Sequence, residues 1–227
     1  MARSMCWHCQ SEVTGEYFCD HCVKVQPVSK ETDYFTVFGL PRRLTIDPPA
    51  LEAKFYELSR TFHPDFYHNK STEERAISLQ NSAVLNTAYR TLKDPIQRIE
   101  YLLGLEAGAV KDIRTSPPAD LFEEILELQE DLEQYRSRSP DQDAAGTERL
   151  KAKLTEDRQL LERRQHDMEE RLSQLSGEWD RLQGSVQAAP TTADKAKRES
   201  ILKEMREILS HRTYLRNIIN DLVATTG

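Results

Sequence analysis

The chain has 227 residues, of which 38% are hydrophobic and 30% are charged, a balance typical of a helix-rich protein with one or two packed domains. Its formal net charge of −7 argues against nucleic acid as a partner, because non-specific affinity for phosphate backbones requires clustered Lys and Arg. Its apolar runs are too short to span a membrane, so a membrane is not an expected partner either.

The first 22 residues contain all the cysteines, in two Cys-x-x-Cys pairs formed by Cys6 and Cys9 and by Cys19 and Cys22. Each pair can place two thiolates on one side of a tight turn, and nine intervening residues allow the pairs to meet around one tetrahedral ion. This spacing predicts a structural zinc ion, one per chain, with a closed shell that leaves no position for catalysis. A pair of disulfides is the alternative, which an intracellular compartment disfavours.

Two histidines, His8 and His21, lie inside the cysteine pairs, and we expect them to be bystanders because four thiolates complete the shell. So small a segment cannot bury a core, so metal binding supplies most of its folding free energy. We expect metal removal to loosen residues 1–25 and to leave the helices intact. The segment before Cys6 has neither a secretory apolar region nor room for a mitochondrial presequence. We therefore interpret the protein as cytoplasmic and bacterial, with the mitochondrial matrix as the less favoured compartment.

An amphipathic helix is expected to begin after Asp47, a good N-cap residue, with Pro48 at the first helical position. Its apolar residues recur in steps of four, three and four, which predicts one buried stripe. These residues are Leu51, Phe55, Leu58 and Phe62. Pro64 cannot continue the hydrogen-bond ladder and disfavours helical geometry at His63, so the helix should end there.

A second helix is expected to open at Ser71-Thr72-Glu73-Glu74, a capping-box pattern. The apolar stripe predicted for it consists of Ala76, Leu79, Ala83, Leu85 and Leu92. Two antiparallel helices would then hold His63, Pro64 and Asp65 at the tip of a hairpin. The local pattern buries none of these three residues, so they are free to meet a partner.

Sequences on both sides of this hairpin carry a resemblance to a known family. Asp-Tyr-Phe-Thr-Val-Phe-Gly-Leu-Pro begins at Asp33, and Tyr-Arg-Thr-Leu-Lys-Asp-Pro-Ile-Gln-Arg begins at Tyr89. Together with His-Pro-Asp at residues 63–65, these segments resemble a J-domain. The opening motif and Arg-Ile-Glu-Tyr-Leu-Leu at residues 98–103 resemble the HscB-type co-chaperones of iron–sulfur cluster assembly. The likeness extends from Asp33 to Leu105, and some members of the family carry an amino-terminal tetracysteine element.

The resemblance implies that the hairpin binds a DnaK/HscA-type chaperone and stimulates its ATPase. In that family the Asp of the tripeptide pairs with an arginine of the chaperone, the Pro fixes the loop and the His supports the contact. Basic residues on the preceding helix meet an acidic face of the same chaperone. The chaperone-binding residues implied here are His63, Pro64, Asp65, Lys54, Arg60 and, in the same loop, Lys70.

Breakers between residues 104 and 118 indicate a domain boundary, and three long helical patterns follow it. The first contains Leu121, Ile125, Leu128, Leu132 and Tyr135, and the other two lie near residues 147–182 and 201–222. Their stripes predict an antiparallel three-helix bundle. The second helix would be about 54 Å long at 1.5 Å per residue, which is long for a compact domain and allows it to project.

The first bundle helix has an apolar face that its core seam does not explain. Phe122 and Leu126 lie about 100 and 140 degrees from Leu121, away from the seam. A wide stripe covered by another helix is one explanation. The family resemblance offers another, because a matching face with flanking glutamates binds the iron–sulfur scaffold protein in HscB-type proteins. Phe122, Leu126, Glu127 and Glu130 are the client-binding residues it implies.

The predicted fold is all-α, with a tetracysteine element at residues 1–26, a J-domain at 32–105 and the bundle at 118–227. The predicted function is a co-chaperone that delivers a scaffold client to a DnaK/HscA-type chaperone. The alternative is a zinc-bearing coiled-coil adaptor in which the hairpin is only structural. An enzyme is not expected, because the sequence shows no nucleophile–base pair, Gly-rich phosphate loop or open metal site.

Overall fold

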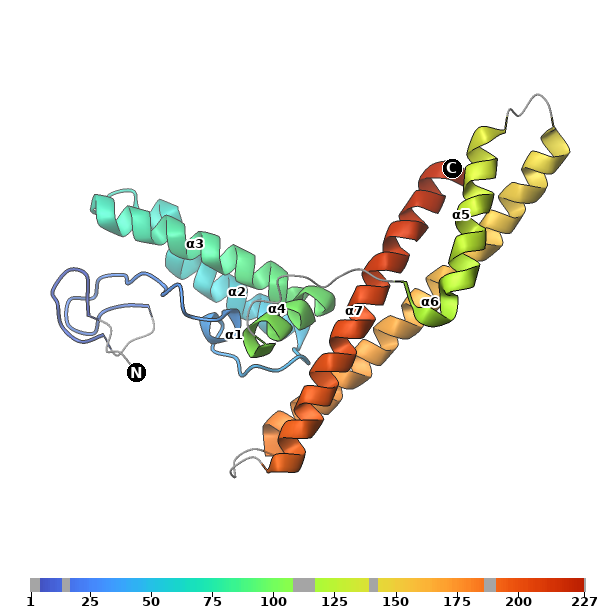
Figure 1. Cartoon of the computed structure of the whole chain (residues 1–227). Coiled ribbons are helices and arrows are strands. Elements are labelled where there is room, and N and C mark those ends of the chain that lie inside the picture. Colours follow the sequence, from blue (N-terminus) through green and yellow to red (C-terminus); the bar gives the residue numbers. More distant parts are fainter. Residues whose placement is uncertain (1–4, 14–16, 108–116, 139–142, 186–190, 227) are drawn as a thin grey trace. The chain divides into compact units, whose positions relative to one another are not determined.

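The computed structural model describes residues 5–13, 17–107, 117–138, 143–185 and 191–226 (Figure 1). The predicted domain boundary at residues 104–118 lies partly outside these ranges. Regular structure in these ranges is helical, which confirms the predicted all-α class. The chain forms two compact units, Met1–Leu102 and Leu103–Gly227. The division into three segments stays a prediction. None of the described helices is both long enough and apolar enough to cross a membrane.

Helices α2 (Pro48–Phe62) and α3 (Thr72–Lys93) form the hairpin of the first unit. Asp47 caps α2, because its carboxylate accepts a hydrogen bond from the Ala50 amide at 3.3 Å. The helix ends at Phe62, one residue before the backbone leaves helical geometry at His63. A short 3-10 helix, η1 (Pro64–Tyr67), then makes the turn. The predicted beginning and end of this helix are confirmed.

The start of α3 is a capping box, as predicted. Ser71 Oγ accepts from the Glu74 amide at 3.2 Å, and Glu74 Oε2 accepts from the Ser71 amide at 3.3 Å. The same carboxylate also binds Lys24 Nζ at 2.8 Å, and only 7% of the Glu74 side chain is exposed. One buried carboxylate therefore caps α3 and holds the chain that follows the cysteines.

The buried face of α3 differs from the apolar stripe predicted for it. Leu85 and Leu92 are buried, but Ala76 and Ala83 are exposed and Leu79 is 59% exposed. For these three residues the prediction was wrong. The period of the apolar residues predicted the burial of Leu85 and Leu92 correctly. It could not show that polar residues occupy the rest of the buried face.

Two of the polar residues that replace them are Ser78 and Asn81, both fully buried. Ser78 Oγ and Ser82 Oγ donate to the Phe62 carbonyl at 2.7 and 2.8 Å. Asn81 bonds to the segment after the cysteines, accepting from the Val28 amide at 2.9 Å. These partners are distant in sequence, and each removes the cost of burying a polar group.

Helices α1 (Tyr34–Val37) and α4 (Pro95–Ala107) bring the two flanking motifs together. The rings of Tyr34 and Tyr101 stack with centroids 4.3 Å apart, and the Tyr34 amide donates to the Tyr101 hydroxyl at 2.9 Å. Asp33 caps α1 through the Thr36 amide at 2.9 Å. The helical rhythm was expected to stop at Gly104, but α4 continues to Ala107.

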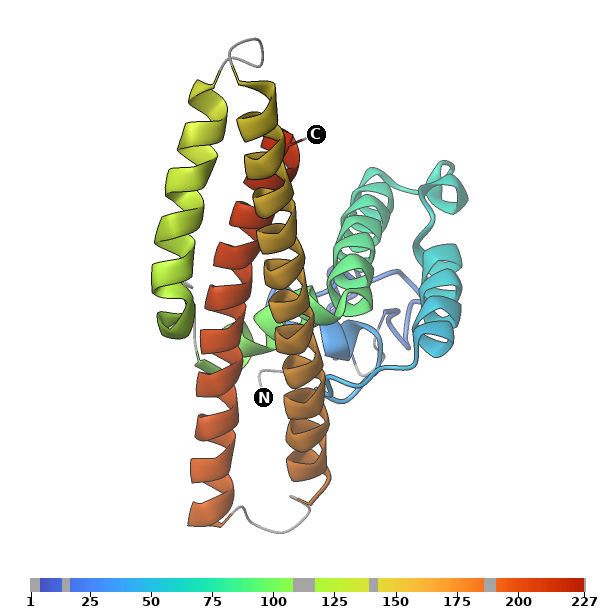
Figure 2. The same ribbon diagram turned by 90° about the vertical axis from the view of Figure 1, so that its right-hand side faces the viewer.

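Helices α5 (Phe122–Ser137), α6 (Ala144–Ser185) and α7 (Thr192–Thr226) form the second unit, and η2 (Ala119–Leu121) precedes α5. Figure 2 shows α6 and α7 side by side over most of their length, with α5 beside one part of them. The predicted antiparallel three-helix bundle is confirmed. Helix α6 has 42 residues, about 63 Å at 1.5 Å per residue, and is paired with α7 rather than projecting alone.

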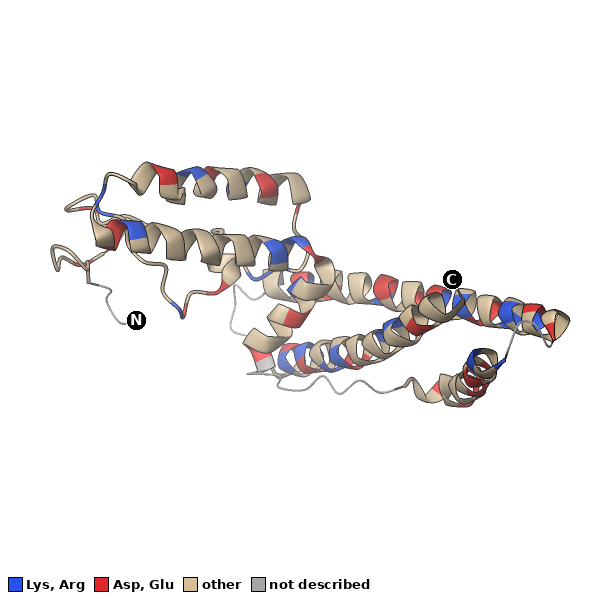
Figure 3. Ribbon diagram, turned by 90° about the horizontal axis from the view of Figure 1, so that it is seen from above, with Lys and Arg blue, Asp and Glu red and all other residues tan. Residues whose placement is uncertain are grey.

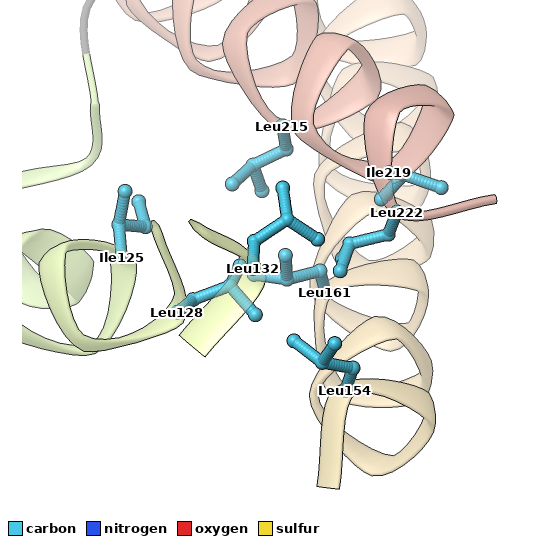
Figure 4. Packing of buried hydrophobic residues seen from close by; sticks show 8 residues of the cluster. All are labelled: Ile125, Leu128, Leu132, Leu154, Leu161, Leu215, Ile219 and Leu222. Carbon is cyan, nitrogen blue, oxygen red and sulfur yellow. The ribbon is translucent and has the colours of Figure 1, made fainter. Parts of the chain in front are cut away.

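Leucine and isoleucine from all three helices fill the bundle core (Figure 4). The cluster in which residues of all three helices meet consists of Ile125, Leu128, Leu132, Leu154, Leu161, Leu215, Ile219 and Leu222. Each is at most 8% exposed. Burial of this set supplies the hydrophobic free energy that holds the three helices together.

Acidic and basic residues alternate along α6 and α7 (Figure 3). Several of these charges pair between helices, such as Arg171 with Glu204 at 2.7 Å and Arg212 with Glu169 at 2.6 Å. Glu169 therefore lies against α7 instead of facing solvent alone.

Replacement of Glu74 with Gln should lower the free energy of unfolding at pH 7 by about 1 to 2 kcal/mol, because the hydrogen bonds to Lys24 and to the Ser71 amide lose the negative charge of their acceptor. Lys24 and the Ser71 amide, against the opposing effect of burial, hold the pKa of the Glu74 carboxyl below its usual range. That stability is present above the unfolded pKa of about 4.3 and is lost as pH falls through the depressed folded pKa.

Denaturant titrations of both proteins between pH 7 and pH 3 would measure this difference. It should shrink below about pH 4.3, the ordinary glutamate pKa. A difference that stays constant over the whole range would contradict the assigned role of the carboxylate.

Candidate functional site

The two cysteine pairs lie in turns with the same backbone hydrogen bonds. In each, the amide of the first cysteine donates to a carbonyl five residues later, and its carbonyl accepts from an amide four residues later. The bonds are Cys6 to Ser11 (2.8 Å), Gln10 to Cys6 (3.0 Å), Cys19 to Lys24 (2.9 Å) and Val23 to Cys19 (2.8 Å). Two equivalent turns therefore present one cysteine pair each.

Each turn places the residue after its second cysteine in the left-handed region, Gln10 at φ 60° and Val23 at φ 58°. This conformation is unfavourable for a β-branched residue such as Val23, and its side chain is 75% exposed and gains little from packing. The turn at Cys19 is therefore strained. Ligand bonds to a metal are the natural source of the free energy that offsets such strain.

The four sulfur atoms lie within 4.8 Å of one another. Cys6 Sγ is 3.6 Å from Cys22 Sγ, and Cys9 Sγ is 3.7 Å from Cys19 Sγ. A tetrahedral site with metal–sulfur bonds of about 2.3 Å has sulfur–sulfur edges of about 3.8 Å, whereas a disulfide bond is about 2.05 Å long. The cysteines are free thiols positioned to bind a metal ion. The disulfide alternative does not fit this geometry.

The electrostatics of the cluster also favour a cation. Burial raises the pKa of the Cys6 thiol, but amides of Cys9 and His8 hydrogen-bond to its thiolate, and the net result is a pKa of about 6. Burial and the neighbouring thiols instead raise the pKa of Cys22 to about 12. Four sulfurs in one pocket cannot all ionise together unless a positive ion compensates their charge. His8 and His21 are exposed and lie outside the sulfur cluster.

The hairpin tip presents the tripeptide to solvent. His63 Nδ1 accepts a hydrogen bond from the Asp65 amide at 3.3 Å, so the imidazole caps η1. The Asp65 side chain is 86% exposed and the His63 side chain is 51% exposed. Behind the tip, Tyr67 is buried and its hydroxyl donates to the Thr61 carbonyl at 3.0 Å. The structure therefore fixes the backbone of the tip and leaves its carboxylate accessible.

The basic residues expected to assist the tip are not all brought together. The Lys70 amide donates to the Tyr67 carbonyl at 2.9 Å, which keeps Lys70 in the tip loop. Lys54 and Arg60 lie about 120 degrees apart around α2, at 100 degrees per residue. Lys54 Nζ binds Glu57 at 3.0 Å. Because exposed ion pairs are weak, Lys54 can exchange that partner for another carboxylate.

The predicted client face of α5 is exposed. Phe122 is 51% and Leu126 is 47% exposed, whereas Ile125 and Leu128 are at most 4% exposed. Within the described part of the second unit, neither α6 nor α7 buries the first pair, so the wide-stripe explanation does not account for them. Phe122, Leu126 and Glu130 follow one another at intervals of four, which places them on one helix face.

The two glutamates expected to flank this face differ in their surroundings. Glu127 Oε1 binds Lys153 Nζ of α6 at 2.6 Å, and Lys153 also binds Asp131 at 2.7 Å. Glu130 is exposed on the same side as Leu126. The structure therefore keeps Glu130 beside the apolar pair and directs Glu127 toward α6.

Sequence reasoning missed two residues of these sites. Gln26 is 6% exposed, and its Nε2 donates to Cys6 Sγ at 3.3 Å. Phe66 follows Asp65 directly and is 65% exposed, with its ring 6.0 Å from that of His63. An apolar residue in a polar loop was a usable signal for Phe66. Gln26 gave none, because its contact joins residues 20 positions apart.

Comparisons with known proteins agree with the resemblance seen in the motifs, although no family model matches the chain. It is 38% identical over 125 residues to "Iron-sulfur cluster co-chaperone protein HscB homolog" of Arabidopsis thaliana, covering 55% of this chain and 49% of that protein. It is 33% identical over 154 residues to "Iron-sulfur cluster co-chaperone protein HscB" of Mus musculus, covering 65% of each. It is 37% identical over 113 residues to "Co-chaperone protein HscB homolog" of Aliivibrio salmonicida, covering 49% of this chain and 66% of that protein.

The matches thus span about half to just under two thirds of the length of these relatives. Among solved structures, human co-chaperone protein HscB superposes with a TM-score of 0.67 at 23% identity, covering 97% of this chain and 98% of that one. At this identity the superposition establishes a shared fold.

Proposed function

We propose that this chain, a homologue of the HscB co-chaperones, brings an iron–sulfur cluster scaffold protein to a DnaK/HscA-type ATPase and stimulates that ATPase. The single observation that carries the proposal is the hairpin tip, where a rigid backbone holds Asp65 with its side chain 86% exposed. Because hydrogen bonds already hold the tip backbone, binding there costs little conformational entropy, so this exposed carboxylate suits recognition of a cationic partner residue.

At the tip, each residue has a separate task. Asp65 offers a carboxylate to an arginine of the chaperone, an interaction strengthened by charge and by bidentate geometry. Pro64 ends α2 and fixes the direction in which the tip leaves it. His63 caps η1 through the Asp65 amide and so orients the carboxylate. Lys54, Arg60 and Lys70 add positive charge that speeds encounter with an acidic face.

On the second unit, Phe122 and Leu126 would dock the scaffold client. Two large apolar side chains about half exposed on one face make the kind of anchor that dominates binding energy at protein interfaces. Glu130 supplies charge at the edge of this face. The client and the chaperone would thus bind separate helices of one chain.

The metal bound by Cys6, Cys9, Cys19 and Cys22 would be zinc, because four thiolates in tetrahedral geometry are the preferred ligand set of structural zinc. Zinc would supply folding free energy and close the shell, without an open position for a substrate. We accordingly assign the chain to proteins that act by binding and not by catalysis. The adaptor alternative, with a hairpin that is only structural, is an outcome of the tests below.

Purification under reducing conditions should give one zinc per chain, because the four sulfurs form one site. Elemental analysis measures the metal, and thiol titration before and after chelation counts the cysteines that it protects. Four protected thiols and one zinc are the expected result. A protein with no metal and two disulfides would exclude this assignment.

Replacement of Asp65 with Asn should reduce stimulation of the partner ATPase by about thirtyfold or more, since loss of one partner of an interfacial charge pair typically costs about 2 kcal/mol or more. Single-turnover ATP hydrolysis by the chaperone measures the effect. The fold should persist, because the Asp65 side chain is exposed.

The matched control is Asp167→Asn, the same change at an exposed position of α6, which should stimulate fully. Full stimulation by the Asp65 variant, at a circular dichroism signal equal to that of the wild type, would contradict the role assigned to Asp65. Absence of any stimulation by the wild-type chain would support the adaptor alternative.

Replacement of both Phe122 and Leu126 with Ala should weaken scaffold binding by at least about thirtyfold, because truncation of an anchor typically costs about 2 to 4 kcal/mol. Stability should fall only slightly, since both side chains are about half exposed. Calorimetry against a purified iron–sulfur scaffold measures affinity, and thermal melting measures stability.

Leu128→Ala is a control for the effect of lost stability, because Leu128 is buried in the same helix, at 4% exposed. Its truncation should destabilise the bundle by about 2 to 5 kcal/mol. Glu130→Gln should flatten the salt dependence of binding more than Glu127→Gln does, since Glu127 is already paired with Lys153. Unchanged affinity in the double variant would remove this face from the proposal.

A further inference from the structure

The sulfur cluster and the hairpin are joined by buried hydrogen bonds that meet at Gln26 and Asn81. Gln26 Nε2 donates to Cys6 Sγ at 3.3 Å, and the Gln26 carbonyl accepts from Asn81 Nδ2 at 2.9 Å. Asn81 Oδ1 accepts from the Val28 amide at 2.9 Å. Asn81 is fully buried in α3, so its amide group is satisfied by residues that follow the cysteines.

From Asn81 the contacts continue to the hairpin tip through its neighbours on α3. Ser78 and Ser82 lie three residues before and one residue after Asn81, and both donate to the Phe62 carbonyl, at 2.7 and 2.8 Å. Phe62 is the last residue of α2, directly before His63. The position of α3 therefore fixes the point from which the tip leaves α2.

Two further contacts tie the cysteine turns to the same helices. The Tyr17 ring meets the Phe62 ring edge-on with centroids 5.1 Å apart, and Lys24 binds Glu74 at the start of α3. Together with Gln26 and Asn81, these contacts attach the cysteine-bearing segment at three places. The expectation that metal removal would leave the helices intact does not fit this arrangement, because buried groups of α2 and α3 depend on that segment.

We propose that the metal bound by the four cysteines controls the rigidity of the hairpin tip, with Gln26 and Asn81 as the positioning residues that couple the two. Without metal, no ligand bonds hold the four sulfurs together against the strained Val23 backbone, so the turns open and Gln26 loses its sulfur acceptor. Asn81 is then left buried without its partners, so α3 shifts or opens near Ser78 and Ser82. The coupling is reciprocal, so an intact hairpin strengthens metal binding.

The coupling is tested by hydrogen exchange of residues 58–67 with and without metal, and by metal affinity measured in competition with a chelator. Chelation of the wild-type chain should raise exchange in this segment about fivefold or more, the lower end of common coupling strengths. In Asn81→Ala, exchange should already be raised with metal bound and should change little on chelation. By reciprocity, its metal affinity should fall by the same factor.

Thr87→Ala is the matched control, since the Thr87 hydroxyl lies on α3 but bonds only to the Ala83 carbonyl of the same helix among the contacts described, and it should behave as wild type. The absorption spectrum of the cobalt-loaded protein reports on the sulfur ligands directly. It would not change if Gln26 only stabilised the fold. Gln26→Ala removes the hydrogen bond to Cys6 Sγ and should shift the sulfur-to-cobalt absorption, whereas Thr87→Ala should not. If Asn81→Ala does not fold, Gln26→Ala is used for the exchange and affinity measurements as well.

Two results would overturn the inference: exchange of residues 58–67 that is indifferent to metal while residues 17–26 open, or an unchanged metal affinity in the folded variant. Neither measurement requires a chaperone. If the proposed function is wrong but this inference is right, the metal will still control exchange at the hairpin tip, and the chain will not stimulate an ATPase.

Discussion

The Phe62 carbonyl is the point on which the arrangement of the first unit depends. At the end of a helix this carbonyl has no partner within the helix, and Pro64 prevents the chain from continuing to supply one. Ser78 and Ser82 supply two donors from the antiparallel helix instead. That choice of partners joins the end of α2 to the middle of α3, and the three residues that follow Phe62 become an ordered, exposed turn. The proposed chaperone binding depends on the exposure of the tip residues. The proposed coupling to the metal depends on the hydrogen bonds that Ser78 and Ser82 donate to the Phe62 carbonyl.

The cysteine-bearing segment follows a different physical rule, because it has too little apolar surface to fold alone. Its sulfur atoms are 3.6 and 3.7 Å apart in pairs, and such a cluster is stable as thiolates only around a cation. Backbone groups of Gln26 and Val28 in the same segment form hydrogen bonds with Asn81 of α3, and the Lys24 ammonium binds Glu74 of α3. A metal centre in this position affects more than its own turns, since the groups that surround it also complete the polar contacts of the hairpin.

Local signals predicted local structure well. Asp47 with Pro48, and Ser71 with Glu74, fix where two helices begin because each acts on amides within three residues. The four-thiol cluster also followed from spacing, whereas spacing alone left open whether Phe122 and Leu126 are covered by another helix. Periodicity was wrong at Leu79, because the buried face of α3 contains Ser78 and Asn81, whose partners lie 16 to 55 residues away. Gln26 was missed for the same reason, since a hydrogen bond between distant residues leaves no pattern in the sequence.

The proposed function requires the ordered tip of the hairpin to contact a DnaK-type ATPase. Nuclear magnetic resonance of the isotope-labelled chain, titrated with the ATP-bound chaperone, detects that contact residue by residue. Amide signals of residues 63–70, with Lys54 and Arg60, should shift or broaden first, while signals of Phe122 and Leu126 should stay unchanged until a scaffold client is added. Changes confined to the helical bundle, or no change at the tip at saturating chaperone, would show that the tip is not the chaperone-binding surface.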